Sequence, residues 1–550
     1  MRNLLRLLLA LALSSQALAA GTPRGHGAVA SDHELASQAG VAILQQGGNA
    51  IDAAIATALV IGVVNPAGSG LGGGGFLVAW LDGKPHVLDF REVAPAAATR
   101  TMFLGPDGKP VPERSVHGGL AVAVPAESIG LAEAHRRWGR LPWRTLVEPA
   151  RRLAADGFAV GPHLASLVPA LLEQLPVRHP LLAWLAPDGK PLAAGRIVKR
   201  PALAATLARL AEDPHALQRG PLAEEMARAT REAGGLLTAR DLGDYKPVER
   251  VPVEGRFRGL RVIGVGPPGG GLTAIEALQI LDALGPRPAD EVLAVHHVIE
   301  ALNHAFADRP SIADPAFVDV PVARLASPAV ARTLAARVRD DGVLPLSAYG
   351  DHPPPVAPAP HDHGTSHLCA VDAEGGAVAL TTTINLPFGS GVEAAGVILN
   401  DEMDDFTAAP GQMNGLGIIG DERNAVAPGK RPQSSMSPTL LLDGRGVAMC
   451  VGGSGGPTIV SGTVQVIEHV VDEKMDLATA LAAPRLHSQW RPDVVLAEPS
   501  VPAPLVDGLR RLGHRVELRH PPTATNAIRR RGDGWEAASD PRKGAKAASY

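Results

Sequence analysis

The sequence is poor in aromatic residues and in cysteine, and it carries little net charge. Phenylalanine, tryptophan and tyrosine make up 3% of the 550 residues, two cysteines occur, and the formal net charge is −4. This balance lacks the basic patch of a nucleic-acid-binding protein, and two cysteines supply no zinc or redox pattern. With 45% hydrophobic and 20% charged residues, the composition is that of a globular protein of one large core or two to three domains.

The chain also lacks a long apolar run. Arg2 and Arg6 precede the short apolar run 7–13, and Ala17-Leu18-Ala19 supplies a small-x-small cleavage site. These are the parts of a secretory signal, whereas a membrane anchor needs about 20 apolar residues. We therefore expect residues 1–19 to be a signal peptide and the mature protein to be exported without a membrane span, to the periplasm or the medium.

The two cysteines, Cys369 and Cys450, both lie in apolar, strand-like surroundings. We expect buried free thiols, which is the common state of isolated cysteines in a core. A single disulfide is the alternative, because an exported protein meets oxidising conditions.

Apolar periodicity divides the chain into strand-rich ends and a helical middle. One helix is expected to end at about residue 46 and a second to span 50–64. Strands are expected over 76–81 and 85–90. The middle of the chain, roughly residues 120–345, is predicted to be mostly helical. Strands return after residue 365, with helices near 457–471 and 477–483. This order predicts an α+β fold whose sheets take strands from both sides of a Pro-rich tract, 351–364.

The junction after this tract could provide a catalytic nucleophile. The tract holds five prolines, and a two-stranded pattern rich in β-branched residues begins at Thr365. If the Gly364–Thr365 bond were cut, the threonine hydroxyl would lie beside its own α-amine, which titrates at roughly 7.7–8.0 and can act as its base. On this segment alone, an ordinary strand-opening threonine is the simpler interpretation.

A second nucleophile candidate is Ser454. The run 452–456 matches G-x-S-x-G, with a strand before it and a helix after it, as a nucleophile elbow requires. Asp493 and either His514 or His520 follow in the order of a catalytic triad.

The same run permits another interpretation, which we favour. Pro457 at the first turn of the helix would leave the amides of Gly455 and Gly456 free at a helix N-terminus. Amides placed in this way form an oxyanion hole rather than a nucleophile.

Two further patterns are weaker. Gly264–Gly269 formally matches a dinucleotide-binding loop, but no acid-terminated strand follows it, so close backbone approach is the better interpretation. His296, Glu300 and His304 share one helical face and are metal-ligand types. We interpret this face as an ordinary polar one and predict no metal site.

Charged and hydroxylic residues elsewhere would suit a zwitterionic amino acid. A guanidinium and hydroxyls would hold its carboxylate, and carboxylates would hold its ammonium. The residues concerned are Arg91, Asn385, Glu402, Asp405, Ser434 and Ser435.

Ordered segments over essentially the whole mature chain resemble the gamma-glutamyltranspeptidases. In the first half they are Gly47-Gly48-Asn49-Ala50, Leu71-Gly72-Gly73-Gly74-Gly75-Phe76 and Asp89-Phe90-Arg91-Glu92. In the second half they include residues 365–372, Thr383-Ile384-Asn385, residues 400–406, Ser434-Ser435-Met436-Ser437 and Ser539-Asp540-Pro541-Arg542.

The resemblance implies a four-layer αββα N-terminal-nucleophile hydrolase, made as a precursor and cut before Thr365. A large subunit (20–364) and a small catalytic subunit (365–550) would form a heterodimer. Thr365 would be the nucleophile, Thr383 its support, and Gly455 and Gly456 the oxyanion hole. The six residues of the amino-acid cluster would bind the γ-glutamyl group of glutathione, and water or an amino-acid or peptide amine would accept it. No metal or organic cofactor is implied.

The sequence departs from the family pattern at the substrate entrance. No tyrosine occurs in residues 410–420, and Leu416 takes the place of the lid tyrosine of bacterial members. Gly269-Gly270 and Pro457-Thr458 replace more polar pairs. An acylase of the same fold that acts on glutaryl or cephalosporin side chains, a Ser454 α/β-hydrolase, and an amino-acid-binding protein are the alternatives.

Overall fold

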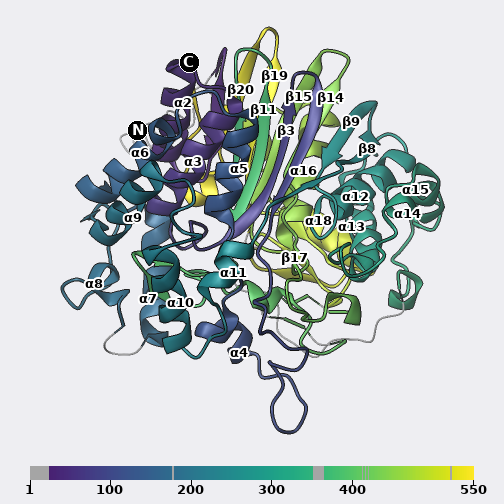
Figure 1. Cartoon of the computed structure of the whole chain (residues 1–550). Coiled ribbons are helices and arrows are strands. Elements are labelled where there is room, and N and C mark those ends of the chain that lie inside the picture. Colours follow the sequence, from purple (N-terminus) through teal and green to yellow (C-terminus); the bar gives the residue numbers. More distant parts are fainter. Residues whose placement is uncertain are drawn as a thin grey trace, which may run out of the picture.

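Two seven-stranded antiparallel sheets lie at the centre of the molecule (Figure 1). The computed structural model describes residues 24–175, 179–350, 364–411, 413–414, 417–418, 420–520 and 523–550. The first sheet has the order β1 (Arg24–Gly25), β20 (Gly534–Ala538), β19 (Ala524–Arg531), β15 (Gly446–Ser454), β14 (Thr439–Asp443), β9 (Leu260–Gly264) and β8 (Val253–Phe257). The second has the order β21 (Ala548–Ser549), β2 (Ala28–Ser31), β10 (Ser366–Val371), β11 (Ala377–Thr383), β3 (Gly74–Leu81), β4 (Lys84–Phe90) and β7 (Val248–Arg250).

The sheets pack face to face through alternate side chains of their strands. In β10, Cys369 and Val371 enter the core between the sheets, whereas Leu368 and Ala370 enter the core between the second sheet and its helices. This alternation is the period of two that a strand buried on both faces requires. The whole of β10 is therefore buried, and the residue before it lies at a buried edge.

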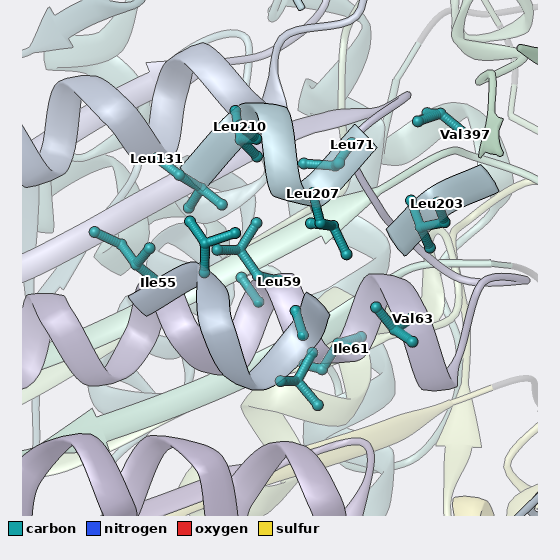
Figure 2. Packing of buried hydrophobic residues seen from close by; sticks show 14 of the residues in the cluster. Ile55, Leu59, Ile61, Val63, Leu71, Leu131, Leu203, Leu207, Leu210 and Val397 are labelled. Atoms are coloured by element: carbon teal, nitrogen blue, oxygen red, sulfur yellow. The ribbon is translucent and has the colours of Figure 1, made fainter. Parts of the chain in front are cut away.

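Helices cover the outer face of each sheet, so the predicted four-layer αββα architecture is confirmed. Figure 2 shows Ile55 and Leu59 beside Leu131 and Leu207 in the helical layer of the second sheet. That layer contains α2 (Glu34–Gln45), α3 (Ala50–Val64), α5 (Glu127–Trp138), α6 (Trp143–Asp156), α7 (Pro162–Gln174), α9 (Pro201–Glu212), α10 (Pro221–Glu232) and α11 (Ala239–Asp244). The layer of the first sheet contains α12 (Gly271–Ala283), α13 (Glu291–Asp308), α15 (Pro328–Ala335), α16 (Thr458–Val471) and α17 (Leu477–Ala482).

A smaller unit extends from the first sheet's helical layer. It contains β16 (Leu486–His487), β17 (Val495–Ala497), α18 (Ala503–Arg511) and β18 (Val516–Leu518), and α13 packs against it.

Strands β7, β8 and β9 come from the middle of the chain, which we expected to be mostly helical. In β8, Val253, Gly255 and Phe257 are buried while Glu254 and Arg256 are exposed. The exposed charged residues interrupt the apolar signal, and the buried residues of β8 are covered by α12, a contact that the local pattern does not reveal. The sheets therefore draw on the middle as well as on both ends.

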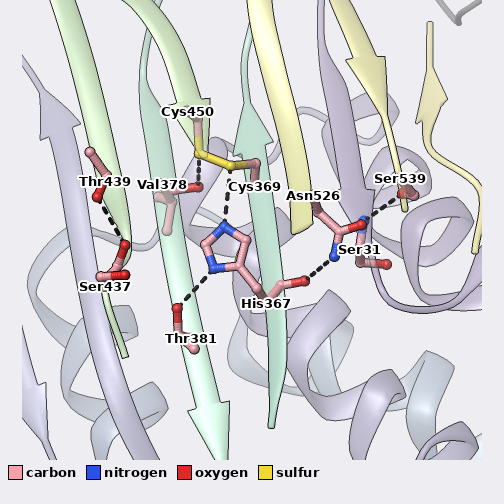
Figure 3. Close-up of a disulfide and its surroundings, with 10 residues drawn as sticks. All are labelled: Ser31, His367, Cys369, Val378, Thr381, Ser437, Thr439, Cys450, Asn526 and Ser539. Atoms are coloured by element: carbon pink, nitrogen blue, oxygen red, sulfur yellow. Dashed lines mark hydrogen bonds between the residues drawn. A yellow bond between two sulfur atoms is a disulfide. The ribbon is translucent and has the colours of Figure 1, made fainter. Parts of the chain in front are cut away.

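The expectation of two free thiols is wrong, because Cys369 and Cys450 form a disulfide. Figure 3 shows this bond joining β10 to β15, and the two Cα atoms lie 5.9 Å apart. Both cysteines are fully buried in the core between the sheets. Sequence alone gave no way to see that the two strands stack face to face, and this stacking is what makes pairing possible.

Several sequence predictions fall outside the described residues: the signal peptide 1–19, residues 351–363 of the Pro-rich tract, and Leu416 in the lid segment. Within the described ranges, none of the helices combines the length and apolar character that spanning a membrane requires.

Removing the disulfide should lower the stability of the sheet stack. Replacing both cysteines with alanine is expected to reduce the free energy of unfolding by about 2–4 kcal/mol, because the cross-link restricts the unfolded chain. Urea unfolding followed by circular dichroism measures this difference. Reductant should lower the unfolding midpoint of the wild type only; an equal response in the double variant would contradict the assignment.

Candidate active site

Thr365 lies directly before β10, at the buried end of the second sheet. Its side chain is 5% exposed, its amide donates to the Gly68 carbonyl at 2.7 Å, and its own carbonyl accepts from Lys543 Nζ at 3.0 Å. Its φ is +95°, which a β-branched residue adopts only under strain. The backbone around Thr365 is therefore held on both sides in an unfavourable conformation.

The Thr365 hydroxyl contacts the Thr383 hydroxyl at 2.8 Å. Thr383 Oγ1 also accepts a hydrogen bond from the Asn385 amide at 2.8 Å. Since that contact uses an acceptor position of Thr383, its hydroxyl hydrogen remains available for Thr365 Oγ1. Thr383 can thus stabilise negative charge that develops on the Thr365 oxygen.

The packing of β10 on β15 indicates what faces Thr365. Cys369 meets Cys450 in the disulfide, and a Cβ built on Gly452 would lie 2.4 Å from the His367 ring. Moving two more residues, back along β10 and forward along β15, leads to Thr365 on one strand and Ser454 on the other. Gly455 and Gly456 come next, with φ of +119° and +59°, at the corner where β15 turns into α16. The structure therefore brings the predicted oxyanion glycines to the same end of the sheet stack as Thr365.

The alternative Ser454 triad is not assembled in the structure. The Ser454 hydroxyl is buried and lies 3.4 Å from the Ala524 carbonyl, which accepts its hydrogen bond. His514 Nε2 instead lies 2.7 Å from His296 Nδ1, and Asp493 and His520 are exposed. Antiparallel stacked sheets also differ from the parallel sheet on which an α/β-hydrolase elbow is built.

The structure brings Arg91, Glu402 and Asp405 together in a buried ion cluster. The Arg91 guanidinium, which follows β4, donates to both carboxylates, and its side chain is fully buried. It also donates to the carbonyls of Pro432 at 3.2 Å and Gln433 at 3.0 Å. Asn385 is joined to the residue before Glu402, because its side-chain Nδ2 donates to the Asp401 carbonyl at 3.1 Å.

Burial and like charge disturb the carboxyl groups of this cluster. Burial raises the pKa of Glu402 well above its usual range, against the opposing effect of Arg91. Burial likewise raises the pKa of Glu92 to about 8. Glu402 Oε2 is buried without a hydrogen-bond partner among the described residues. The cluster therefore has an acceptor that an ammonium group would satisfy.

Two basic residues at the site escaped the sequence analysis. Arg309, at the end of α13, donates to Gln433 Oε1 at 2.9 Å and to Ser435 Oγ at 3.2 Å, and burial lowers its pKa to about 10. Lys543 holds the Thr365 carbonyl and Asp32. A single basic residue at a helix end or in a C-terminal segment looks like a surface charge, so the sequence carried no signal for either.

The predicted carboxylate-binding serines also lie in this region, with their hydroxyls already engaged. Ser434 Oγ accepts from the Met436 amide at 3.1 Å, and Ser435 Oγ from Arg309. A cavity of about 30 Å³ lies beside Asp405, Arg309 and Asn414. Its lining does not include Thr365, Arg91 or Glu402, so this cavity lies at the edge of the site.

Two stacked antiparallel sheets between helical layers, with a threonine opening a central strand, define the class of N-terminal-nucleophile hydrolases. The Gamma-glutamyltranspeptidase family model matches residues 36–550, and this chain belongs to that family. It is an enzyme that acts on γ-glutamyl bonds.

Individual relatives agree with this placement. The Glutathione hydrolase proenzyme of Escherichia coli (strain K12) is 37% identical over 531 residues, which cover 94% of this chain and 90% of the relative. That of Pseudomonas aeruginosa is 37% identical over 97% of this chain and 96% of the relative. Among solved structures, a cephalosporin acylase from Bacillus halodurans superposes with a TM-score of 0.84 at 28% identity, covering 96% of both chains. Helicobacter pylori gamma-glutamyltranspeptidase gives 0.55 at 33% identity over 57% of this chain and 92% of that chain.

Replacing Glu402 with glutamine should abolish a rise of kcat/KM with increasing pH. Because the pKa of Glu402 is raised, its carboxyl is neutral at low pH and ionises as pH rises, so the specificity constant kcat/KM for a γ-glutamyl anilide should rise with it. In Glu402→Gln this rise is absent, and kcat/KM falls about 10- to 100-fold at high pH with one charged hydrogen bond lost.

Glutaryl anilide, which lacks the α-ammonium, is the matched control substrate. Its kcat/KM should change little in Glu402→Gln. Superimposable pH profiles of wild type and variant with the γ-glutamyl substrate would contradict a role of Glu402 in binding the ammonium.

Proposed function

We propose that the protein cuts itself between Gly364 and Thr365 and then uses Thr365 to cleave glutathione and other γ-glutamyl amides. The observation that carries this proposal is the Thr365 hydroxyl, 2.8 Å from Thr383 Oγ1 at a strained, buried strand start. The relatives named proenzymes support a precursor.

Self-cleavage would proceed by an acyl shift from nitrogen to oxygen. Thr365 Oγ1 would attack the Gly364 carbonyl carbon, forming an ester as the Gly364–Thr365 C–N bond breaks and the Thr365 nitrogen takes up the hydroxyl proton. Water then hydrolyses the ester, leaving a Gly364 carboxylate and a free Thr365 hydroxyl and amine. Cutting releases the backbone strain at Thr365, which is worth about 1–3 kcal/mol.

The new amine would serve as the base of the mature enzyme. Its nitrogen already lies 2.7 Å from the Gly68 carbonyl, which holds it next to its own hydroxyl. Thr365 Oγ1 attacks the γ-carbonyl of the donor and passes its proton through the amine to the leaving amine. The Gly455 and Gly456 amides at the start of α16 stabilise the oxyanion. Water or an amino-acid or peptide amine then takes the γ-glutamyl group from the ester.

Donor recognition would rearrange the ion cluster. The substrate ammonium binds Glu402, Asp405 and Asn385, satisfying the orphan oxygen of Glu402. The substrate carboxylate replaces a carboxylate partner of Arg91 and takes hydrogen bonds from Ser434 and Ser435. This exchange keeps every buried charge paired.

Two chains produced by the cut would stay together as a heterodimer. A large subunit, 20–364, would supply β1, β2, β3, β4, β7, β8 and β9, and a small subunit, 365–550, would supply the remaining strands of both sheets. The strand pairs β2–β10, β3–β11, β9–β14 and β1–β20 each join the two subunits.

The proposed location of the protein is outside the cytoplasm, after removal of residues 1–19. The Cys369–Cys450 disulfide can form there.

An acylase of the same fold is the second candidate, favoured by the 0.84 TM-score of the cephalosporin acylase. Such an enzyme would prefer glutaryl anilide to γ-glutamyl anilide. The buried carboxylates Glu402 and Asp405 favour a donor with an α-ammonium instead.

Denaturing electrophoresis of purified protein tests the cut. Wild type should give two fragments, the smaller beginning at Thr365, and Thr365→Ala one uncut, inactive chain. Ser454→Ala should be cut and keep substantial activity. An intact wild-type chain that hydrolyses γ-glutamyl anilide would refute the proposal, and activity lost only in Ser454→Ala would favour the elbow. A binding protein would turn over no substrate.

Gly364→Ala should slow self-cleavage without unfolding the protein. A Cβ at Gly364 would lie 2.4 Å from the Asn385 carbonyl oxygen, so the scissile bond must shift away from the Thr365 hydroxyl. The uncut fraction over time, read from gels, measures the effect. Gly444→Ala, where a Cβ meets no atom within 4 Å, is the matched control and should be cut normally. Equal cutting rates in both variants would contradict the proposed geometry.

A further inference from the structure

A group of metal-ligand side chains outside the candidate active site joins α13 to His514, three residues beyond the end of α18. His296 Nδ1 lies 2.7 Å from His514 Nε2, and these atoms and a Glu300 carboxylate oxygen all lie within 4.8 Å of one another. All three side chains are buried. The sequence put His296 and Glu300 on one helical face with His304, but the fold brings in His514 as the third member.

Hydrogen-bond partners orient two of these side chains. His296 Nε2 lies 2.7 Å from the Arg339 carbonyl, which only accepts, so this nitrogen carries the hydrogen and Nδ1 presents a lone pair to His514. The Tyr349 hydroxyl donates to the Glu300 carboxylate at 2.7 Å. Metal-binding histidines and carboxylates are typically held by such outer partners.

His304 lies beside this group but outside the set of ligand atoms that approach one another. It lies one turn beyond Glu300, is 2% exposed, and neither ring nitrogen has a hydrogen-bond partner among the described residues. Its ring packs on Tyr349, the residue bonded to Glu300, with centroids 4.8 Å apart.

We propose that His296, Glu300 and His514 bind a divalent transition-metal ion, with zinc as the best match. Two imidazoles and one carboxylate are a zinc ligand set that leaves a fourth position open. Binding requires the His514 proton to move from Nε2 to Nδ1, which frees a second lone pair. The two nitrogens must separate from 2.7 Å to roughly 3.3 Å to place each at bonding distance from zinc.

The other groups of ligand-type residues in the described part of the chain are less suitable. Cys369 and Cys450, beside His367, are held in the disulfide and offer no thiolate. Glu468 and Glu473, beside His469, are both paired with Arg287.

Such an ion would connect the two chains that the proposed cut creates. His296 and Glu300 precede the cut and His514 follows it, and α13 and α18 lie side by side (Figure 1). The ion would thus act as a staple between the subunits. This consequence rests on the proposed function, whereas metal binding itself does not.

Metal content tests the site directly. Full-length protein is stripped with chelator, dialysed against zinc sulfate and measured by elemental mass spectrometry. Wild type should hold one zinc ion per pair of cut chains, and His514→Gln should bind it about 100-fold more weakly or not at all. His297→Gln is the matched control, because the neighbouring His297 bonds the carboxylate of Asp340 and lies outside the group. Wild type without bound zinc, or equal binding in His514→Gln, would overturn the proposal.

A second set of variants separates ligand loss from misfolding. Glu300→Gln should lose zinc, and Tyr349→Phe should weaken binding about 10-fold through the lost outer hydrogen bond. Circular dichroism checks that each variant is folded. Cobalt should give the visible absorption of a low-symmetry site in the wild type and not in Glu300→Gln; the same spectrum in both would refute the ligand set.

The uncut Thr365→Ala chain separates the two proposals. It should bind zinc as tightly as the wild type, since its ligands are unchanged. In cut wild type, zinc should raise the urea concentration at which the fragments separate, with no such shift in His514→Gln. Zinc bound by a wild-type chain that stays uncut would refute the proposed function and leave the metal site standing.

Discussion

The packing of β10 on β15 is the contact on which the rest of the site depends. β10 pairs with β2 and β11 within its sheet, and the Cys369–Cys450 bond fixes it to the opposite sheet. Because strand positions advance in steps of two on each face, this one fixed point places Thr365 opposite the end of β15. A one-residue slip would turn the Thr365 hydroxyl away from Thr383 and from the glycine corner.

The electrostatic part of the site is held in a paired state that a substrate can replace. A buried guanidinium with two carboxylates is tolerable only because each charge has a partner. A γ-glutamyl group carries both an ammonium and a carboxylate, so it can exchange partners with the cluster without leaving a buried charge unpaired. The same requirement disfavours a donor that lacks the ammonium, which would leave Glu402 and Asp405 without a new cation.

Local sequence patterns predicted most of the fold but few of the contacts within the site. The almost wholly apolar helix over Ala50–Val64 and the hairpin after Thr365 followed from periodicity, and the αββα layering from the family resemblance. Strand β8 was missed because alternate charged residues interrupt its apolar signal and α12 covers its buried face. Arg309, Lys543 and the disulfide depend on contacts between distant segments, for which one sequence gives no signal. His514 illustrates the same limit, since its partner His296 is 218 residues away in the chain.

In the proposed reaction, the hydroxyl of Thr365 carries the γ-glutamyl group during turnover. The most direct measurement is to quench the enzyme during reaction with a slow γ-glutamyl donor, digest it, and locate the added mass by peptide sequencing. We expect one γ-glutamyl group in ester linkage to the peptide that begins with Thr365. The same mass on the peptide containing Ser454, or on no peptide while substrate is consumed, would contradict it.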